Sequence, residues 1–268
     1  MGNLGKRILA GLILAPLVLA CIWWGGMPYQ VLIAVGLLLT LREWMVITTP
    51  AASYRTLVIA TLLVLFVAEL ADASGSVLWP LAILALSFPG LWLLARRAGC
   101  QLPVVSALGP LYLGACFQAL SWLRGAPDDL EGRNILLYLF LAIWAVDTGA
   151  YALGKAIGGP KLAPRLSPKK TWAGLVGGIL AAAAVGYGWA VVTAAPAPVL
   201  IALVGLPLAV VAQAGDLLES AIKRRFGVKD SGSLIPGHGG LLDRIDGFLL
   251  ASPVFLLFYE FTHHFWHG

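Results

Sequence analysis

Long apolar runs recur along this chain and constrain its fold more than any other feature. A helix of about 17–25 apolar residues crosses the ~30 Å hydrocarbon core of a bilayer. Lipid offers no hydrogen-bond partner to an open sheet edge, so a crossing segment is a helix or part of a closed barrel. The sequence therefore predicts an all-α, polytopic integral membrane protein with about nine transmembrane helices. The apolar runs lie at approximately 8–24, 29–47, 56–71, 77–95, 104–122, 134–153, 173–193, 198–218 and 247–265.

The distribution of polar residues divides the chain into an N-terminal half of plain hydrophobic segments and a C-terminal half that carries the candidate functional residues. Hydrophobic residues make up 60% of the 268 residues and charged residues only 12%, whereas a soluble domain carries about 25% charged residues. The first five runs are plain hydrophobic segments, and the last four carry the unusual polar residues. We therefore predict an N-terminal transmembrane region over 1–125 and a C-terminal catalytic transmembrane region over 126–268.

The positions of the cationic residues predict the orientation. Placing the N-terminus in the cytoplasm leaves only Arg124 and Arg133 of the 18 lysines and arginines outside, as the positive-inside rule requires. Two long polar loops, 154–172 and 219–246, then face the cytoplasm. The first run follows Lys6 and Arg7 and ends in VLAC, as a lipoprotein signal peptide does, but the further runs favour a retained helix.

The cysteines and the C-terminal histidines do not indicate a metal site. Cys21, Cys100 and Cys116 show no CxxC spacing, so neither a zinc site nor a disulfide framework is supported. The histidines near the C-terminus are better explained as a solvated tail than as metal ligands. They are His263, His264 and His267.

An aspartate inside the sixth apolar run is the first candidate for function. Asp147 lies in LAIWAVDTGAYALGK, and an ionisable group within a span normally faces a bundle interior or a wet cavity. A structural polar plug is the alternative. Gly149 and Gly154 nearby would let another helix or a ligand approach closely.

The segment KLAPRLSPKKTWAG (161–174) combines a helix start with several cationic side chains. Its two prolines hold the chain extended until a helix begins near Ser167–Thr171, and a helix N-terminus binds anions. Arg165, Lys169 and Lys170 add positive charge where a phosphate would lie. The alternative is a generic basic loop that touches anionic lipid heads.

The eighth run ends in QAGDLLESAIKRRFGVKD, which has a polar helical face. Asp216, Glu219, Ser220 and Lys223 are spaced i, i+3, i+4 and i+7, so they share one face of a helix. A solvated helix end is the alternative, but it does not explain Asp216, which lies close to the hydrocarbon.

The stretch KDSGSLIPGHGGLLDRID (229–246) is the most polar part of the chain. Its glycines predict a tight loop whose N–H groups can approach a ligand. Asp243 and Asp246 follow one turn apart on the start of the last helix, where a cap is the alternative for one of them. Together with Asp216 they are suitable oxygen ligands for Mg²⁺. The residues alone thus indicate Mg²⁺-dependent chemistry on a phosphorylated substrate, with a lipid as the other partner.

Residues 220–246, SAIKRRFGVKDSGSLIPGHGGLLDRID, resemble the signature of phosphatidate cytidylyltransferases, also called CDP-diacylglycerol synthases. DTGAY around Asp147, SPKKTW at 167–172 and GDLLES at 215–220 are similar to the same family. The resemblance is specific over about 140–247 and architectural before that. One departure is visible, because Ala173 stands where the family usually has glutamate.

The resemblance implies an enzyme that converts CTP and phosphatidate into CDP-diacylglycerol and pyrophosphate for phospholipid biosynthesis. It implies that Asp216 and Asp243 hold Mg²⁺, with Asp246 near the second ligand or a second cation such as K⁺. Lysines and Arg244 would bind phosphates, and His238 would contact the nucleotide or shape the loop, with a general-acid role as the alternative. The implied catalytic residues are Asp216, Ser220, Lys223, Asp243, Arg244 and Asp246. The implied substrate-binding residues are Asp147, Ser167, Lys169, Lys170, Thr171, Lys229, Asp230, His238, Gly239 and Gly240.

Two other functions stay open at this point. The nearer is a CTP-dependent polyprenol or lipid kinase, and the more distant is a membrane transporter with Asp147 as the coupling residue. The resemblance also implies a multi-pass protein of the bacterial inner (plasma) membrane with its active site on the cytoplasmic side. CTP, phosphatidate and the bilayer are the expected partners, with no nucleic acid. The family further suggests a homodimer, for which no residue in the sequence argues.

Overall fold

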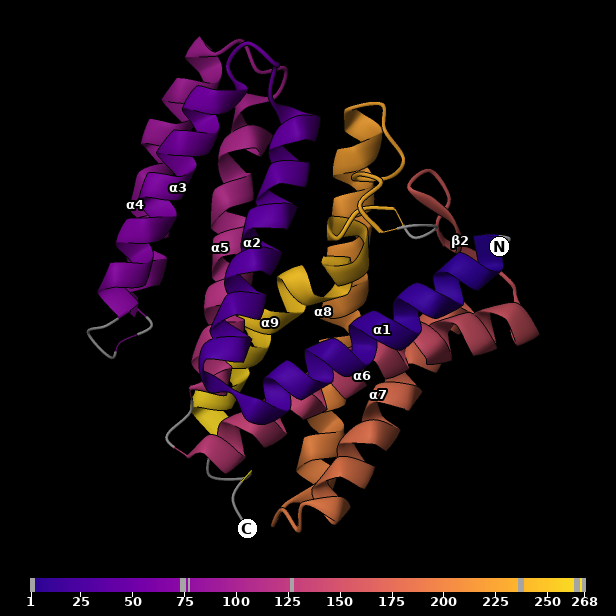
Figure 1. The fold of residues 1–268 in the computed structure, drawn as a ribbon. Coiled ribbons are helices and arrows are strands. Elements are labelled where there is room, and N and C mark those ends of the chain that lie inside the picture. Colours follow the sequence, from indigo (N-terminus) through magenta and orange to yellow (C-terminus); the bar gives the residue numbers. More distant parts are fainter. Residues whose placement is uncertain are drawn as a thin grey trace. The chain divides into compact units, whose positions relative to one another are not determined.

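The computed structural model describes residues 3–72, 76, 78–125, 128–235, 239–262 and 266. Within these residues the chain forms nine α-helices and one small antiparallel sheet (Figure 1), so the predicted all-α membrane class is confirmed. Seven of the described helices are long and apolar enough to cross a membrane. The count of nine spans and the cytoplasmic N-terminus stay predictions. The elements are α1 (Asn3–Trp24), α2 (Gly26–Thr48), α3 (Tyr54–Asp72), α4 (Leu78–Arg97), α5 (Pro103–Arg124), α6 (Asp129–Ile157), β1 (Lys161–Ala163), β2 (Ser167–Thr171), α7 (Trp172–Val192), α8 (Pro198–Arg225) and α9 (Leu242–Thr262).

The chain folds as two compact units whose segments alternate along the sequence. The first unit contains Met1–Val18, Gly26–Ser121 and Ile222–Ile245. The second contains Leu19–Gly25, Trp122–Ala221 and Asp246–Gly268. The end of α8 and the start of α9 therefore belong to the first unit, and the remainder of both helices belongs to the second. The division at residue 125, which was predicted from chemistry rather than from packing, stays a prediction.

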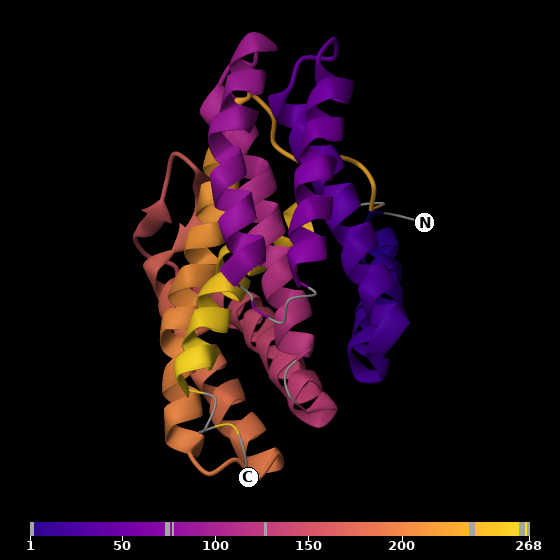
Figure 2. The same ribbon diagram turned by 90° about the vertical axis from the view of Figure 1, so that its left-hand side faces the viewer.

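Helices α2 to α5 make up most of the first unit, and α3 and α4 run side by side as an antiparallel pair (Figures 1 and 2). Buried hydroxyl groups in this unit find carbonyl partners. The Tyr29 hydroxyl donates to the Leu120 carbonyl oxygen at 2.9 Å, and the Ser106 hydroxyl donates to that of Thr48 at 2.9 Å. A buried polar group is costly without such a partner, so these bonds tie α2 to α5.

Glycines set the packing of α6 against α7 in the second unit. A Cβ on Gly177 of α7 would lie 2.5 Å from the carbonyl oxygen of Gly149 on α6 and 2.7 Å from the Leu153 Cβ. Small residues allow two membrane helices to approach until their backbones touch. Val146, Ala182 and Ala209 form a small buried cluster from α6, α7 and α8. The close approach expected at Gly149 is therefore made by a helix.

Replacing Gly177 with alanine is expected to destabilise the protein by about 1–3 kcal/mol, because the added methyl group must displace the backbone of α6. The matched control is Gly188→Ala on the same helix, where an added Cβ meets nothing within 4 Å. Thermal unfolding in detergent measures both variants. Equal melting temperatures for the two would contradict this account of the contact.

A short hairpin connects α6 to α7. Strands β1 and β2 pair antiparallel, with Lys161 opposite Thr171 and Ala163 opposite Ser167 (Figure 2). The extended backbone continues through Thr171, so the helix expected near Ser167–Thr171 begins slightly later, at Trp172. The Thr171 hydroxyl accepts the Gly174 N–H at 3.0 Å and thereby caps α7.

Candidate active site

A buried ion pair joins the end of α8 to the start of α9 in the first unit. The Lys223 Nζ donates to the Asp243 Oδ1 at 2.6 Å. Each residue is only 8% exposed. Two charges at such a position are stable only when they are paired and hydrogen-bonded. The pair therefore fixes the chain on either side of the loop that connects the two helices.

The Asp243 carboxylate also holds this loop by its backbone. The Ser231 N–H lies 3.1 Å from Oδ1 and 2.9 Å from Oδ2, and the Gly240 N–H donates to Oδ2 at 2.9 Å. Gly239 has φ +85°, and a Cβ there would lie 2.6 Å from Oδ2. A glycine is thus required on both conformational and steric grounds.

The loop closes on itself before α9 begins. The Ile235 N–H donates to the Gly239 carbonyl oxygen at 2.9 Å. His238, the predicted nucleotide contact, lies between these two residues and outside the described part of the chain. Its role stays a prediction. The glycine-rich stretch thus has a defined backbone anchor in Asp243, as a tight ligand-binding loop requires.

The sequence did not single out Glu43, which contacts the same loop from α2. Its carboxylate accepts the Leu241 N–H on Oε1 at 2.9 Å and the Leu242 N–H on Oε2 at 2.8 Å. It also accepts the Ser231 hydroxyl on Oε2 at 3.0 Å. The one available signal was an ionisable residue within the apolar run 29–47.

The second unit contains further predicted residues whose side chains contact one another. The Lys170 Nζ on β2 lies 2.6 Å from the Asp216 Oδ2 on α8. The Ser220 hydroxyl, one turn further along α8, donates to the Asp216 Oδ1 at 3.4 Å. The hairpin therefore places Lys170 against Asp216, the predicted metal ligand. The i, i+4 spacing on α8 places Ser220 against the same carboxylate.

Acidic side chains gather around Asp246, the first residue of α9 that belongs to this unit. Asp246 lies within electrostatic range of Asp216, Glu219 and Asp147. Gly215 makes this possible, because a Cβ there would lie 2.9 Å from the Asp246 carbonyl oxygen. Like-charged carboxylates disfavour one another's ionised form, and a cation bound among them would neutralise the repulsion.

The remaining predicted residues differ in how accessible they are. Ser167 is half-buried and Thr171 is buried as the cap of α7. The others are exposed, which leaves their side chains accessible to a substrate. They are Asp147, Lys169, Lys229, Asp230 and Arg244.

The carboxylates of Asp216 and Asp246 fit the usual coordination of Mg²⁺ in proteins. The described residues contain no group of three or more histidine, cysteine, aspartate or glutamate side chains arranged to hold a metal ion. Mg²⁺ commonly takes one or two carboxylates and completes its shell with water and substrate phosphates. Asp216 and Asp246 are both in the second unit and could provide two carboxylates, whereas Asp243 in the first unit engages both of its oxygens with Lys223 and backbone N–H groups.

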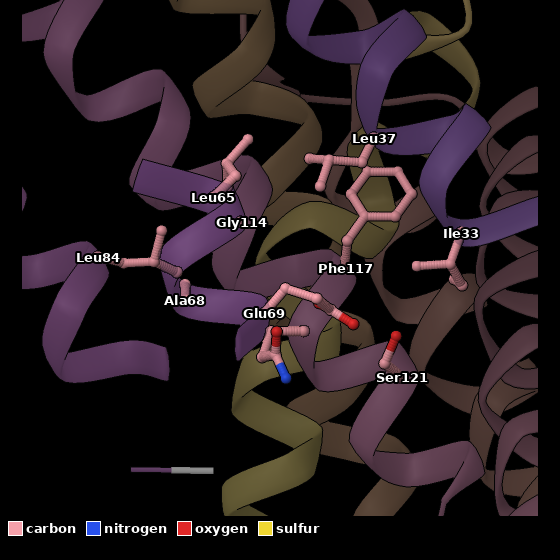
Figure 3. A pocket seen from close by; sticks show the side chains of 10 residues that line it. Ile33, Leu37, Leu65, Ala68, Glu69, Leu84, Gly114, Phe117 and Ser121 are labelled. Carbon is pink, nitrogen blue, oxygen red and sulfur yellow. The ribbon is translucent and has the colours of Figure 1, made fainter. Parts of the chain in front are cut away.

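A pocket in the first unit does not fit the nucleotide. It lies among α2, α3, α4 and α5 and is lined mostly by apolar side chains such as Leu37, Leu65 and Phe117, with Glu69 and Ser121 at its polar part (Figure 3). Its described lining contains no lysine or arginine. The triphosphate of CTP needs cations, so this pocket is not a candidate for CTP binding.

The acidic cluster and the Lys170–Asp216 pair of the second unit indicate chemistry on phosphates. The anchored glycine-rich loop of the first unit indicates the same kind of chemistry. The sequence model of the cytidylyltransferase family matches residues 5–262. The chain belongs to this family and is a nucleotidyltransferase, which confirms the resemblance found in the sequence.

The relatives of this chain carry a more specific name. The phosphatidate cytidylyltransferase of Brucella suis biovar 1 (strain 1330) is 38% identical over 270 residues, covering 96% of this chain and 94% of the relative. That of Rickettsia felis (strain ATCC VR-1525 / URRWXCal2) is 34% identical over 265 residues, covering 94% and 90%. That of Bacillus subtilis (strain 168) is 43% identical over 152 residues, covering 56% and 55%.

Proposed function

We propose that this chain is a phosphatidate cytidylyltransferase, which transfers CMP from CTP to phosphatidate and releases pyrophosphate. The observation that carries the proposal is the similarity to relatives of that name along nearly the whole chain. The match includes the segments in which Lys170, Asp216, Lys223 and Asp243 make their contacts. The two alternative functions, a lipid kinase and a transporter, do not explain this similarity.

The reaction requires charge stabilisation more than proton transfer. A phosphate oxygen of phosphatidate attacks the α-phosphorus of CTP, and the bond from that phosphorus to the oxygen bridging to the β-phosphate breaks. The electron pair leaves with pyrophosphate. Because the attacking phosphate is already an anion, a strong base is unnecessary. The obstacle is the approach of two polyanions, which positioned cations reduce.

The cationic side chains divide into two roles in this proposal. Lys169 and Arg244 are exposed and are assigned to the phosphates of the substrates. Lys170 lies against Asp216, where it can bind a phosphate beside that carboxylate. Lys223 is buried against Asp243, which favours a role in fixing the glycine-rich loop over the direct phosphate contact implied by the resemblance. The Ser220 hydroxyl donates to Asp216 over a long 3.4 Å distance, and it would donate to a phosphate oxygen of the substrate by rotating its one hydrogen away from that carboxylate.

Mg²⁺ is the proposed cofactor, with Asp216 and Asp246 as its carboxylate ligands. When bound, it would neutralise negative charge on the phosphates of CTP and on the leaving pyrophosphate. The support is the cluster of like charges around Asp246. A second cation such as K⁺ and a metal-binding role for Asp243 are parts of the proposal that rest on the family resemblance alone.

The setting of the reaction follows from the helices. The protein is a multi-pass membrane protein, and its substrate lipid would reach the site from the bilayer. We further propose that the membrane is the bacterial inner membrane, with the active site on the cytoplasmic side, where CTP is available. A homodimer is also part of the proposal.

The deciding assay offers the purified chain phosphatidate together with CTP labelled at the α-phosphate, in detergent micelles. The expected result is label in the lipid fraction as CDP-diacylglycerol, with one pyrophosphate released for each product. A parallel reaction with γ-labelled CTP and a polyprenol tests the kinase alternative. Label that stays water-soluble in the first reaction would refute the proposal.

Removal of divalent cations is expected to abolish turnover. Chelation with EDTA takes away the charge that the acidic cluster requires, and added Mg²⁺ should restore the rate. Pyrophosphate release measures both steps, and thermal unfolding checks that the chelated protein remains folded. Undiminished turnover after complete chelation would contradict the assignment of Mg²⁺.

A further inference from the structure

Glu43 is a buried acid that the proposed chemistry does not use. It is 3% exposed and lies near the end of α2, one of the helices apolar enough to cross a membrane. An ionisable residue in such a helix is costly and usually has a function. Its three hydrogen bonds all go to one segment, which ends in the first turn of α9.

The carboxylate of Glu43 substitutes for a local helix cap. The first N–H groups of an α-helix have no partner within the helix. Leu241 and Leu242 stand at the start of α9, and their N–H groups donate to the two oxygens of a residue almost 200 positions earlier in the sequence. The start of α9 is thus fixed by α2, and not only by its own loop.

Two carboxylates bind Ser231, one through its backbone and the other through its side chain. The Ser231 N–H donates to Asp243, and the Ser231 hydroxyl donates to Glu43. Gly240 fits between them, since a Cβ there would lie 2.0 Å from the Ser231 Oγ and 2.5 Å from the Glu43 Oε2. The side chain of Glu43 is therefore connected to that of Asp243 by one residue.

We propose that Glu43 is a positioning residue for cytidylyl transfer, which holds Ser231 and the start of α9 at Leu241 and Leu242 so that Asp243 and Lys223 keep their arrangement. This proposal rests on the proposed function, because cytidylyl transfer is the reaction that Glu43 would support. Glu43 itself touches no substrate in this scheme. Its effect reaches the reaction through Ser231 and through the first turn of α9.

The test compares Glu43→Gln with wild type in two measurements. Glutamine keeps the size of the side chain but turns one acceptor oxygen into an N–H₂ donor that faces other donors. We expect kcat to fall about 10–100-fold, because a displacement of about 1 Å in a site can cost this much. The KM values for CTP and phosphatidate should change less than about twofold. Hydrogen exchange of the full chain in detergent should become faster at Ser231, Leu241 and Leu242, the residues that contact Glu43.

Two further variants separate positioning from general stability. Glu131→Gln alters another buried acid, whose carboxylate accepts the Tyr259 hydroxyl in the second unit. It should lower the melting temperature but leave kcat unchanged. Ser231→Ala should lower kcat less than Glu43→Gln, and the double variant should resemble Glu43→Gln because the two residues share one contact.

Each outcome decides the proposal. An unchanged kcat in Glu43→Gln overturns the proposal. It is also overturned if hydrogen exchange in Glu43→Gln becomes faster evenly along the chain, in the same pattern as in Glu131→Gln. If the wild type makes no labelled lipid from phosphatidate, the proposed function fails. The exchange measurement still shows in that case whether Glu43 holds the loop, because it requires no turnover.

Discussion

Asp243→Asn is expected to reduce cytidylyl transfer by about 10³-fold or more. The asparagine loses the charge that pairs with the Lys223 Nζ at 2.6 Å. Its amide group also turns one acceptor into a donor that faces either Lys223 or the N–H groups of Ser231 and Gly240. The loss of the loop position can by itself cost about 10²-fold in rate, and the buried Lys223 is also left without its counter-charge. The assay with α-labelled CTP gives the rate.

The control for this variant is Asp128→Asn, which makes the same change at the N-cap of α6. Asparagine caps a helix as well as aspartate does, so wild-type turnover is expected. Asp243→Asn should also unfold at a lower temperature, because breaking a buried pair costs about 3–5 kcal/mol. Turnover within tenfold of wild type in Asp243→Asn would show that the ion pair is not needed for the reaction.

Asp216→Asn is expected to reduce the rate of cytidylyl transfer by a similar factor, but for a different reason. It removes one of the two carboxylates proposed for Mg²⁺ and releases Lys170, whose Nζ lies 2.6 Å from Oδ2. The released lysine would then lack the group that places it beside the cation. We expect turnover to fall by about 10³-fold, and the Mg²⁺ concentration for half-maximal rate to rise in whatever activity remains.

Lys170→Met separates the two contributions of Asp216. It leaves the carboxylate in place and should lower turnover while the Mg²⁺ requirement stays near that of wild type. Titration of the rate with Mg²⁺ measures both variants. An unchanged Mg²⁺ requirement in a partly active Asp216→Asn would exclude this residue as a metal ligand.

The helices and several contacts could be predicted from sequence because they depend on local periodicity. Apolar runs predicted the helical class, although the start of α7 was placed a few residues early because the hairpin holds the chain extended to Thr171. The spacing of Asp216 and Ser220 placed both on one face of a helix, and the hydroxyl does reach that carboxylate.

Contacts between distant segments could not be predicted in the same way. The pairing of Lys170 with Asp216 depends on how the hairpin packs, and no spacing in the sequence encodes it. Glu43 was overlooked because its run reads as a plain span, and its partners lie almost 200 residues further on.

The bond from Glu43 to the start of α9 has a consequence for biosynthesis. Ribosomes add about 5–20 residues per second, and 198 residues separate Glu43 from Leu241. The acid therefore enters the membrane about 10–40 s before its donors exist. Nascent chains that end before residue 231 would hold an uncompensated charge in α2. Such truncated products are expected to be preferred substrates for membrane proteases, since the first unit is completed only when synthesis has reached Ile245.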